Sequence, residues 1–115
     1  YAAAGRLLNA DISEIAIVDS ATRAWTAAFY ALPLKEGDRI LTGASEYVSN
    51  YLAFLQVTKR TGAVVEAVPS DESGQISVDA LADVIDDRTK LIAITHVPTN
   101  GGLVNPAAAI GKLAA

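Results

Sequence analysis

The chain has 115 residues, which is room for one modest domain, and its net charge of −4 without a basic cluster argues against nucleic acid as a partner. Hydrophobic residues make up 51% of it, but many are alanines, which bury little area, so only marginal stability is expected of the chain alone. It has no cysteine and one histidine, His96, which excludes a disulfide framework, a thiolate nucleophile and a metal site built from several histidines.

The first third of the chain predicts two helices with a strand between them. Residues 1–9 have helical spacing, and residues 15–18 form a short apolar run between polar residues, which is typical of a strand buried on both faces. Small capping residues follow at 19–22. They predict a helix from about Thr22 to Ala31, which stops before Pro33.

The rest of the chain continues the alternation of strands and helices. Apolar residues recur at spacings of three and four over residues 46–60, which predicts an amphipathic helix that Gly62 ends. Pro106 is a normal start signal for a last helix. The remaining expected elements are strands at 39–42, 63–68 and 91–94 and a short helix at 78–85.

Four strands that alternate with helices predict an α/β fold, a three-layer α/β/α arrangement around a mostly parallel sheet. In such folds ligands bind where strands end and helices begin, because the helix amides point there. Three segments occupy that position: residues 19–22, 43–47 and 95–102. We therefore expect any chemistry to be located in these segments.

The segment at 19–22 could hold a small phosphate. Free amides at the helix start and the hydroxyls of Ser20 and Thr22 would bind it, with the helix dipole assisting. An ordinary helix cap is the alternative interpretation. The glycine patterns of dinucleotide and nucleoside triphosphate sites are missing here, which disfavours those ligands.

The other two segments offer an aromatic ring and polar groups. Tyr47, at the start of a helix, could cover a flat heteroaromatic ligand, although half-buried packing is an alternative. Thr99 and Asn100 offer hydrogen bonds beside two glycines that allow close approach of a ligand. His96 is expected to be a hydrogen-bonded structural residue rather than a general base, because no neighbouring carboxylate would orient it.

These segments occur in a recognisable order along residues 10–115. Ser-Ala-Thr at 20–22 follows the first predicted strand, and Ser-Gly-Gln-Ile stands at 73–76. Two longer motifs are Gly-Asp-Arg-Ile-Leu-Thr at 37–42, followed by Glu-Tyr-Val-Ser-Asn at 46–50, and Thr-Lys-Leu-Ile-Ala-Ile-Thr-His-Val-Pro-Thr at 89–99. Together they resemble the aminotransferase class V and cysteine desulfurase-like family of fold-type I enzymes, which depend on pyridoxal 5'-phosphate (PLP). The resemblance implies that residues 1–115 are part of the large cofactor-binding domain.

The resemblance also implies roles for particular residues. Ala21 and Thr22 match the turn that holds the phosphate of PLP, and Tyr47 matches the aromatic residue that stacks on the pyridine ring. Thr99 matches the residue that contacts the phenolic oxygen of the cofactor, with Asn100 as a neighbouring candidate. Cysteine desulfurases usually have histidine at the position of Tyr47. The tyrosine therefore favours the epimerase, lyase or aminotransferase-like members over a strict desulfurase.

The residues that carry the chemistry in this family are expected downstream of the chain. They are the lysine that binds PLP covalently and the aspartate that pairs with its ring nitrogen. The four lysines present, at 35, 59, 90 and 112, match no such motif, so no catalytic residue and no metal ligand is assigned and the chain alone should be inactive. The parent enzyme is expected to be a homodimer that acts on a small-molecule amino acid.

The expected location of the parent is the cytoplasm, without a membrane or nucleic-acid partner. Residues 1–9 lack a basic region followed by an apolar stretch, and charges or glycines interrupt each apolar run of the chain. Two other functions stay open. One is a non-catalytic α/β module that binds a small phosphorylated ligand or a protein partner. The other, disfavoured by the missing glycine pattern, is a nucleotide-dependent oxidoreductase.

Overall fold

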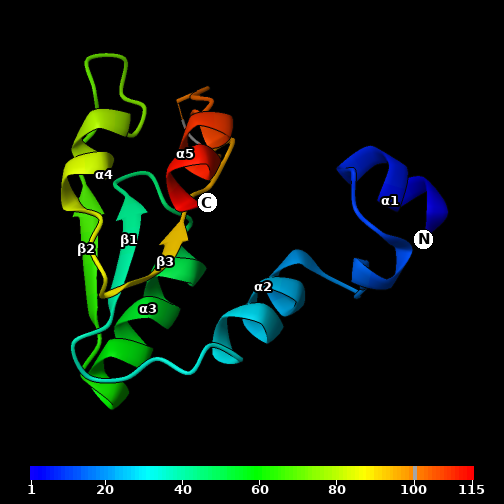
Figure 1. Ribbon diagram of the computed structural model, residues 1–115, viewed down its shortest axis with the longest axis horizontal. Helices are drawn as coiled ribbons and strands as arrows, with labels where there is room; N and C mark the ends of the chain where they lie inside the picture. The colour runs from blue at the N-terminus through cyan, green and yellow to red at the C-terminus, as the bar shows by residue number, and fades with distance from the viewer. Residues whose placement is uncertain (100) are drawn as a thin grey trace. The chain divides into compact units, whose positions relative to one another are not determined.

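The computed structural model describes residues 1–99 and 101–115, which form two compact units, Tyr1–Pro33 and Leu34–Ala115 (Figure 1). The first contains the helices α1 (Ala2–Leu8) and α2 (Ala21–Tyr30), with a short 3-10 helix, η1 (Ile12–Glu14), between them. The second contains the strands β1 (Arg39–Gly43), β2 (Val64–Val68) and β3 (Thr89–Ala93) and the helices α3 (Val48–Thr61), α4 (Val78–Val84) and α5 (Ala107–Ala114).

The first unit is built from capped helices. Ser20 is the N-cap of α2, and its Oγ accepts a hydrogen bond from the amide of Arg23 at 3.2 Å. The rings of Trp25 and Phe29, one helical turn apart, stack with their centroids 4.6 Å from each other. The helix begins and ends one residue earlier than the sequence predicts, well before Pro33.

The predicted strand at residues 15–18 does not form. Ile15 has an extended backbone, but Ile17 and Val18 are 64% and 46% exposed, and the described residues of the first unit include no strand beside them. The prediction was wrong because an apolar run specifies extended backbone but not the hydrogen-bonded neighbour that a strand requires. The sheet therefore has three strands in the described residues, not four.

The sheet of the second unit is parallel throughout, with β1 in the centre of the order β2-β1-β3. Arg39 lies opposite Val64 on one side and Thr89 on the other, and Thr42 lies opposite Ala67 and Ala93. Because the strands run in the same direction, the loops that follow β1 and β3 leave the sheet at the same edge. The parallel sheet is as predicted.

Helices cover both faces of this sheet. Leu41 is buried with Val68, Ile76, Leu81 of α4 and Ile110 of α5, and these side chains form the core on one face. Its neighbours Ile40 and Thr42 are also fully buried but point to the opposite face, since successive strand side chains alternate. The helix α3 covers that face, and its buried residues are Ala53, Phe54 and Val57. The three-layer α/β/α architecture is confirmed.

Charged side chains join the elements at the amino edge of the sheet. The guanidinium of Arg39 is 2.6 Å from Glu66 of β2 and 3.0 Å from Asp86, and it donates to the carbonyl of Val84 at 2.6 Å. The Arg39 side chain is only 12% exposed, so these contacts hold it within the fold. The hydrogen bond with Glu66 raises the pKa of Arg39. Arg88 approaches the same Oδ2 of Asp86 to 2.7 Å.

These contacts predict that acid destabilises the protein. The hydrogen bond from Arg88, with a smaller part from the charge of Arg39, lowers the pKa of Asp86. A carboxylate whose pKa is lower in the folded protein adds stability above its unfolded pKa of about 4, and this stability is lost as the pH falls through the folded pKa. We expect the midpoint temperature of thermal unfolding, followed by circular dichroism, to decrease as the pH is lowered from about 6 to about 3. Asp86→Asn should reduce this fall, and an unchanged pH profile in that variant would contradict the assignment.

Two further properties bear on function. Among residues 1–99 and 101–115, no helix combines the length and the apolar character needed to cross a membrane. The same residues bring together no group of three histidine, cysteine, aspartate or glutamate side chains that could hold a metal ion.

Candidate functional site

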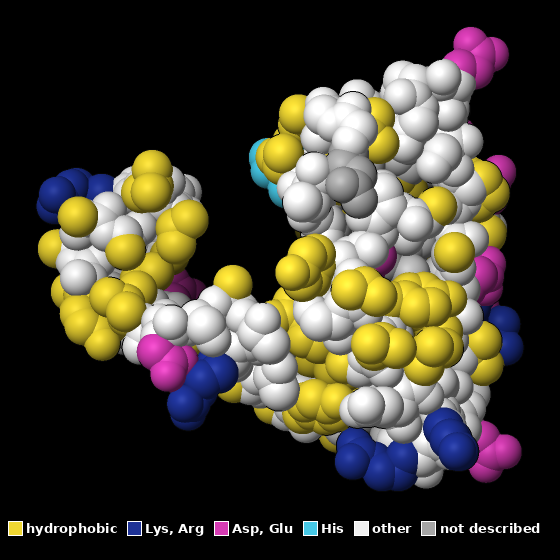
Figure 2. All heavy atoms as spheres, turned by 180° about the vertical axis from the view of Figure 1, so that it is seen from behind, with side chains coloured by type: hydrophobic (Ala, Val, Ile, Leu, Met, Phe, Trp, Pro, Cys, Tyr) yellow, Lys and Arg dark blue, Asp and Glu magenta, His cyan; other side chains and the backbone are white. Residues whose placement is uncertain are grey.

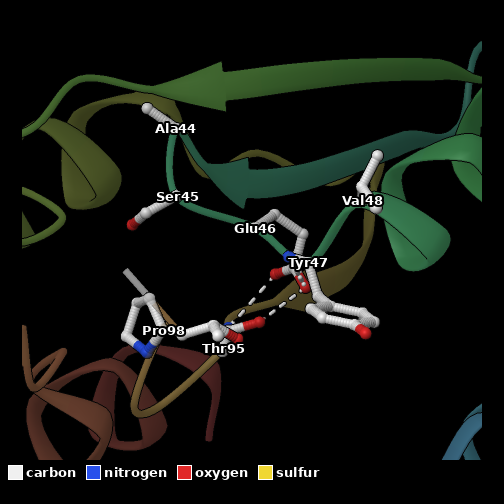
Figure 3. Close-up of a pocket in the computed structure, with 8 residues that line it drawn as sticks. Ala44, Ser45, Glu46, Tyr47, Val48, Thr95 and Pro98 are labelled. Carbon is white, nitrogen blue, oxygen red and sulfur yellow. Dashed lines mark hydrogen bonds between the residues drawn. The ribbon is translucent and has the colours of Figure 1, made fainter. Parts of the chain in front are cut away.

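A cleft of about 350 Å³ opens at the carboxyl edge of the sheet in the second unit (Figure 3). One wall comes from the loop after β1 and the start of α3, and the other from the loop after β3. Two of the three segments that the sequence predicted for a site therefore meet here. The lining residues are Ala44, Ser45, Glu46, Tyr47, Val48, Thr95, Pro98 and Thr99.

Tyr47 gives the cleft its aromatic side chain. It is the N-cap residue of α3, and its side chain is 52% exposed. In Figure 3 its ring lies at the cleft beside Thr95. A ring that is half exposed is compatible both with covering a flat ligand and with the half-buried packing that the sequence left open.

The carboxylate of Glu46 connects the two walls. Its Oε1 accepts hydrogen bonds from the amide of Tyr47 at 2.9 Å and from Oγ1 of Thr95 at 2.7 Å. Its Oε2 accepts one from the amide of Thr95 at 3.1 Å. Further donors are Nδ2 of Asn50 at 2.9 Å and Oγ1 of Thr42 at 3.4 Å.

The buried side chain of Asn105 holds the loop after β3 from its other end. Its Nδ2 donates to the carbonyl of Thr95 at 2.7 Å, and its Oδ1 accepts from the amide of Ile76 at 3.0 Å. The amide of Asn105 also donates to the carbonyl of His96 at 2.8 Å. Both ends of the loop are thereby fixed to each other and to the segment before α4.

The other residues of the loop after β3 differ in how far they are exposed to solvent. Pro98 is buried, whereas Thr99 is exposed and lies on the cleft, where the sequence placed it. The ring of His96, the one histidine, is at the surface (Figure 2), so it is not packed as a structural residue, and its carbonyl makes the contact with Asn105. The predicted candidate Asn100 lies outside the described residues.

The predicted phosphate turn belongs to the first unit. Ala21 and Thr22 are the first two residues of α2, and both are exposed. Amides in the first turn of a helix have no hydrogen-bond partner within the helix. Here the amide of Arg23, the third residue of α2, donates to the hydroxyl of Ser20. The amides of Ala21 and Thr22 and the Thr22 hydroxyl are thus suited to an anion. Arg23 also forms an exposed pair with Asp19 at 3.3 Å.

Sequence reasoning missed Glu46 and Asn105 as parts of the site. The sequence did contain a sign of a role for Glu46, because a carboxylate stands there directly after the small residues that follow a buried strand. For Asn105 the sequence offers only its position before Pro106, because its hydrogen-bond partners lie elsewhere in the chain.

The fold and the cleft define an α/β domain with a cleft at the carboxyl edge of a parallel sheet, the edge where ligands bind in such folds. The model of the aminotransferase class-V family matches residues 2–115, and the chain belongs to this family. A probable cysteine desulfurase from Synechocystis is 34% identical over 104 residues, which are 88% of this chain and 25% of that protein. The chain thus spans about a quarter of the length of such curated relatives.

Solved structures show the same fold. A mutant of C-DES with glycine covalently linked to its PLP cofactor superposes with a TM-score of 0.85 at 24% identity, covering 97% of this chain and 30% of that one. The cysteine desulfurase CsdA of Escherichia coli, in an S-sulfonic acid form, has a TM-score of 0.65 at 28% identity, covering 70% of this chain and 20% of that one.

Proposed function

We propose that the chain is part of the large cofactor-binding domain of a PLP-dependent enzyme that acts on amino acids. The observation that carries this proposal is the cleft on which Tyr47 and Thr99 lie together. The family resemblance alone implies a cofactor contact for both residues. Membership of the aminotransferase class-V family supports the same function.

The chemistry of the residues fits PLP, which combines a flat aromatic ring with a phosphate. We propose that the start of α2, with Ala21 and Thr22, binds the phosphate, that Tyr47 stacks on the ring and that Thr99 donates to a ring oxygen, with Asn100 as a second candidate. When bound, PLP supplies an electron sink for a carbanion next to the reacting nitrogen. These residues bind and orient the cofactor.

None of the four lysines is among the residues that line the cleft. From the family resemblance, we propose that the covalent lysine and the acid that pairs with the ring nitrogen lie outside residues 1–115. The homodimeric assembly and the cytoplasmic location expected from the sequence remain part of the proposal.

For the reaction we propose cleavage of a carbon–sulfur bond in a sulfur-containing amino acid. The relative from Synechocystis is named a probable cysteine desulfurase, and C-DES is described as a cystine C–S lyase in complex with cysteine persulfide. Tyr47, at the position where desulfurases usually have histidine, favours the lyase type. Epimerase and aminotransferase chemistry are the alternatives within the family.

Thr22→Ala tests the phosphate-binding turn. We expect PLP to bind about 10-fold more weakly to the variant, because a hydrogen bond to a charged group contributes about 1.5 kcal/mol or more. The thermal midpoint should change little, since Thr22 is exposed and alanine is a good helix former. A titration of the full-length protein with PLP, followed by visible absorption, measures the affinity. Thr22→Ser, which keeps the hydroxyl, is the matched control, and equal affinity of Thr22→Ala and wild type would refute the assignment.

A further inference from the structure

Glu46 is the only side chain of the cleft, among the described residues, for which hydrogen bonds to both of its walls are seen. On its own side it accepts from the amide of Tyr47, the residue that carries the aromatic ring. Across the cleft it accepts from both the amide and the hydroxyl of Thr95, the residue from which the second loop leaves β3. One carboxylate thus fixes the relative position of the two walls.

The contacts require an acceptor at both oxygens. All five partners of Glu46 are donors, and two of them are backbone amides that cannot turn away: those of Tyr47 on Oε1 and Thr95 on Oε2. A glutamine here would direct its NH₂ group at one of these two amides, whichever way its side chain is turned. At least one backbone amide would then lose its partner.

Thr95 is held on all of its polar groups. Glu46 accepts from its amide and its hydroxyl, and Asn105 donates to its carbonyl at 2.7 Å. Thr99 follows four residues later, after the buried Pro98. The position of Thr99 on the cleft therefore depends on how Thr95 is anchored.

We infer that Glu46 is a positioning residue of the cofactor site. It sets the separation between the ring of Tyr47 and the wall that bears Thr99, so that a flat ligand fits between them, while its own carboxylate is occupied by protein donors. This inference rests on the proposed function, because the ligand it invokes is PLP.

Glu46→Gln in the full-length protein tests this role, with Glu66→Gln as the matched control. Glu66 is also a hydrogen-bonded carboxylate, 2.6 Å from Arg39, but it lies in the middle of β2, opposite Leu41, and is not among the residues that line the cleft. We expect Glu46→Gln to weaken PLP binding about 10-fold or more and to shift the visible band of bound PLP, because the ring is held differently. Glu66→Gln should lower the thermal midpoint without changing either the PLP affinity or the band.

A second pair of variants covers the case in which Glu46→Gln does not fold. Thr95→Val keeps the shape of the side chain but removes the 2.7 Å hydrogen bond to Glu46, whereas Thr95→Ser keeps the hydroxyl. We expect PLP affinity to fall about 5-fold in the valine variant and to stay within about 2-fold of wild type in the serine variant.

The outcomes separate the inference from the function on which it rests. If wild type binds PLP and both Glu46→Gln and Thr95→Val bind it as tightly with the same visible band, the positioning role is refuted and the proposed function stands. The same holds if Glu66→Gln weakens PLP as much as Glu46→Gln, since the effect would then be one of general stability. If wild type binds no PLP, the proposed function fails and the inference with it.

Discussion

Replacing Tyr47 with alanine is expected to weaken PLP binding to the full-length protein by roughly 10- to 30-fold. The loss combines the stacking of two aromatic rings, about 0.5–1.5 kcal/mol, with the apolar area that the ring covers. Because the Tyr47 side chain is 52% exposed, the fold should tolerate the change. Titration with PLP measures the affinity, and circular dichroism checks that the variant is folded.

Tyr47→Phe separates the ring from its hydroxyl. If stacking is the role of Tyr47, phenylalanine should bind PLP within about 3-fold of wild type, since it presents an equivalent aromatic face. Equal affinity of Tyr47→Ala and wild type would remove Tyr47 from the site. An equal loss in both variants would show instead that the hydroxyl makes the important contact.

Replacing Leu81 with alanine is expected to give the largest loss of stability, about 2–5 kcal/mol of the free energy of unfolding. Leu81 is fully buried in the core cluster with Leu41, Val68, Ile76 and Ile110, so the removed atoms leave a cavity between α4, α5 and the sheet. Urea unfolding of the 115-residue chain measures the change. Because the chain alone is expected to be only marginally stable, the change is seen either as a lower midpoint or as the loss of the cooperative transition.

Leu52→Ala is the matched control for this change. Leu52 is the same residue type on α3 but is 54% exposed, and we expect it to cost less than about 1 kcal/mol in the 115-residue chain. A loss below about 1 kcal/mol for Leu81→Ala, or equal losses for the two variants, would contradict the described core.

The sequence predicted the second unit more accurately than the first. Its strands are bounded by glycine, proline and polar residues and its long helix has a clear apolar period, so β1, β2, β3 and α3 form within about two residues of the expected bounds. The segment 15–18 failed because strand formation depends on a neighbour. Local pattern contains no information about that neighbour.

The site was predicted in part for a related reason. In parallel sheets, ligands bind at the carboxyl ends of the strands. This rule was enough to predict that Tyr47 and Thr99, which are far apart in the chain, lie at the same edge, where the structure has the cleft. The roles of Glu46 and Asn105 could not be read in the same way. Glu46 bonds Thr95 across 49 positions and Asn105 bonds Ile76 across 29, and such pairs become visible only once the fold is known.

Binding of PLP by the wild-type full-length protein tests the central claim most directly. The protein would be freed of bound cofactor, titrated with PLP under visible absorption, and its bound phosphate counted per chain. We expect saturable binding of one PLP per chain with a visible band distinct from that of free PLP. The absence of saturable binding by a folded protein would contradict the proposed function and leave a class-V family domain whose cleft serves another ligand.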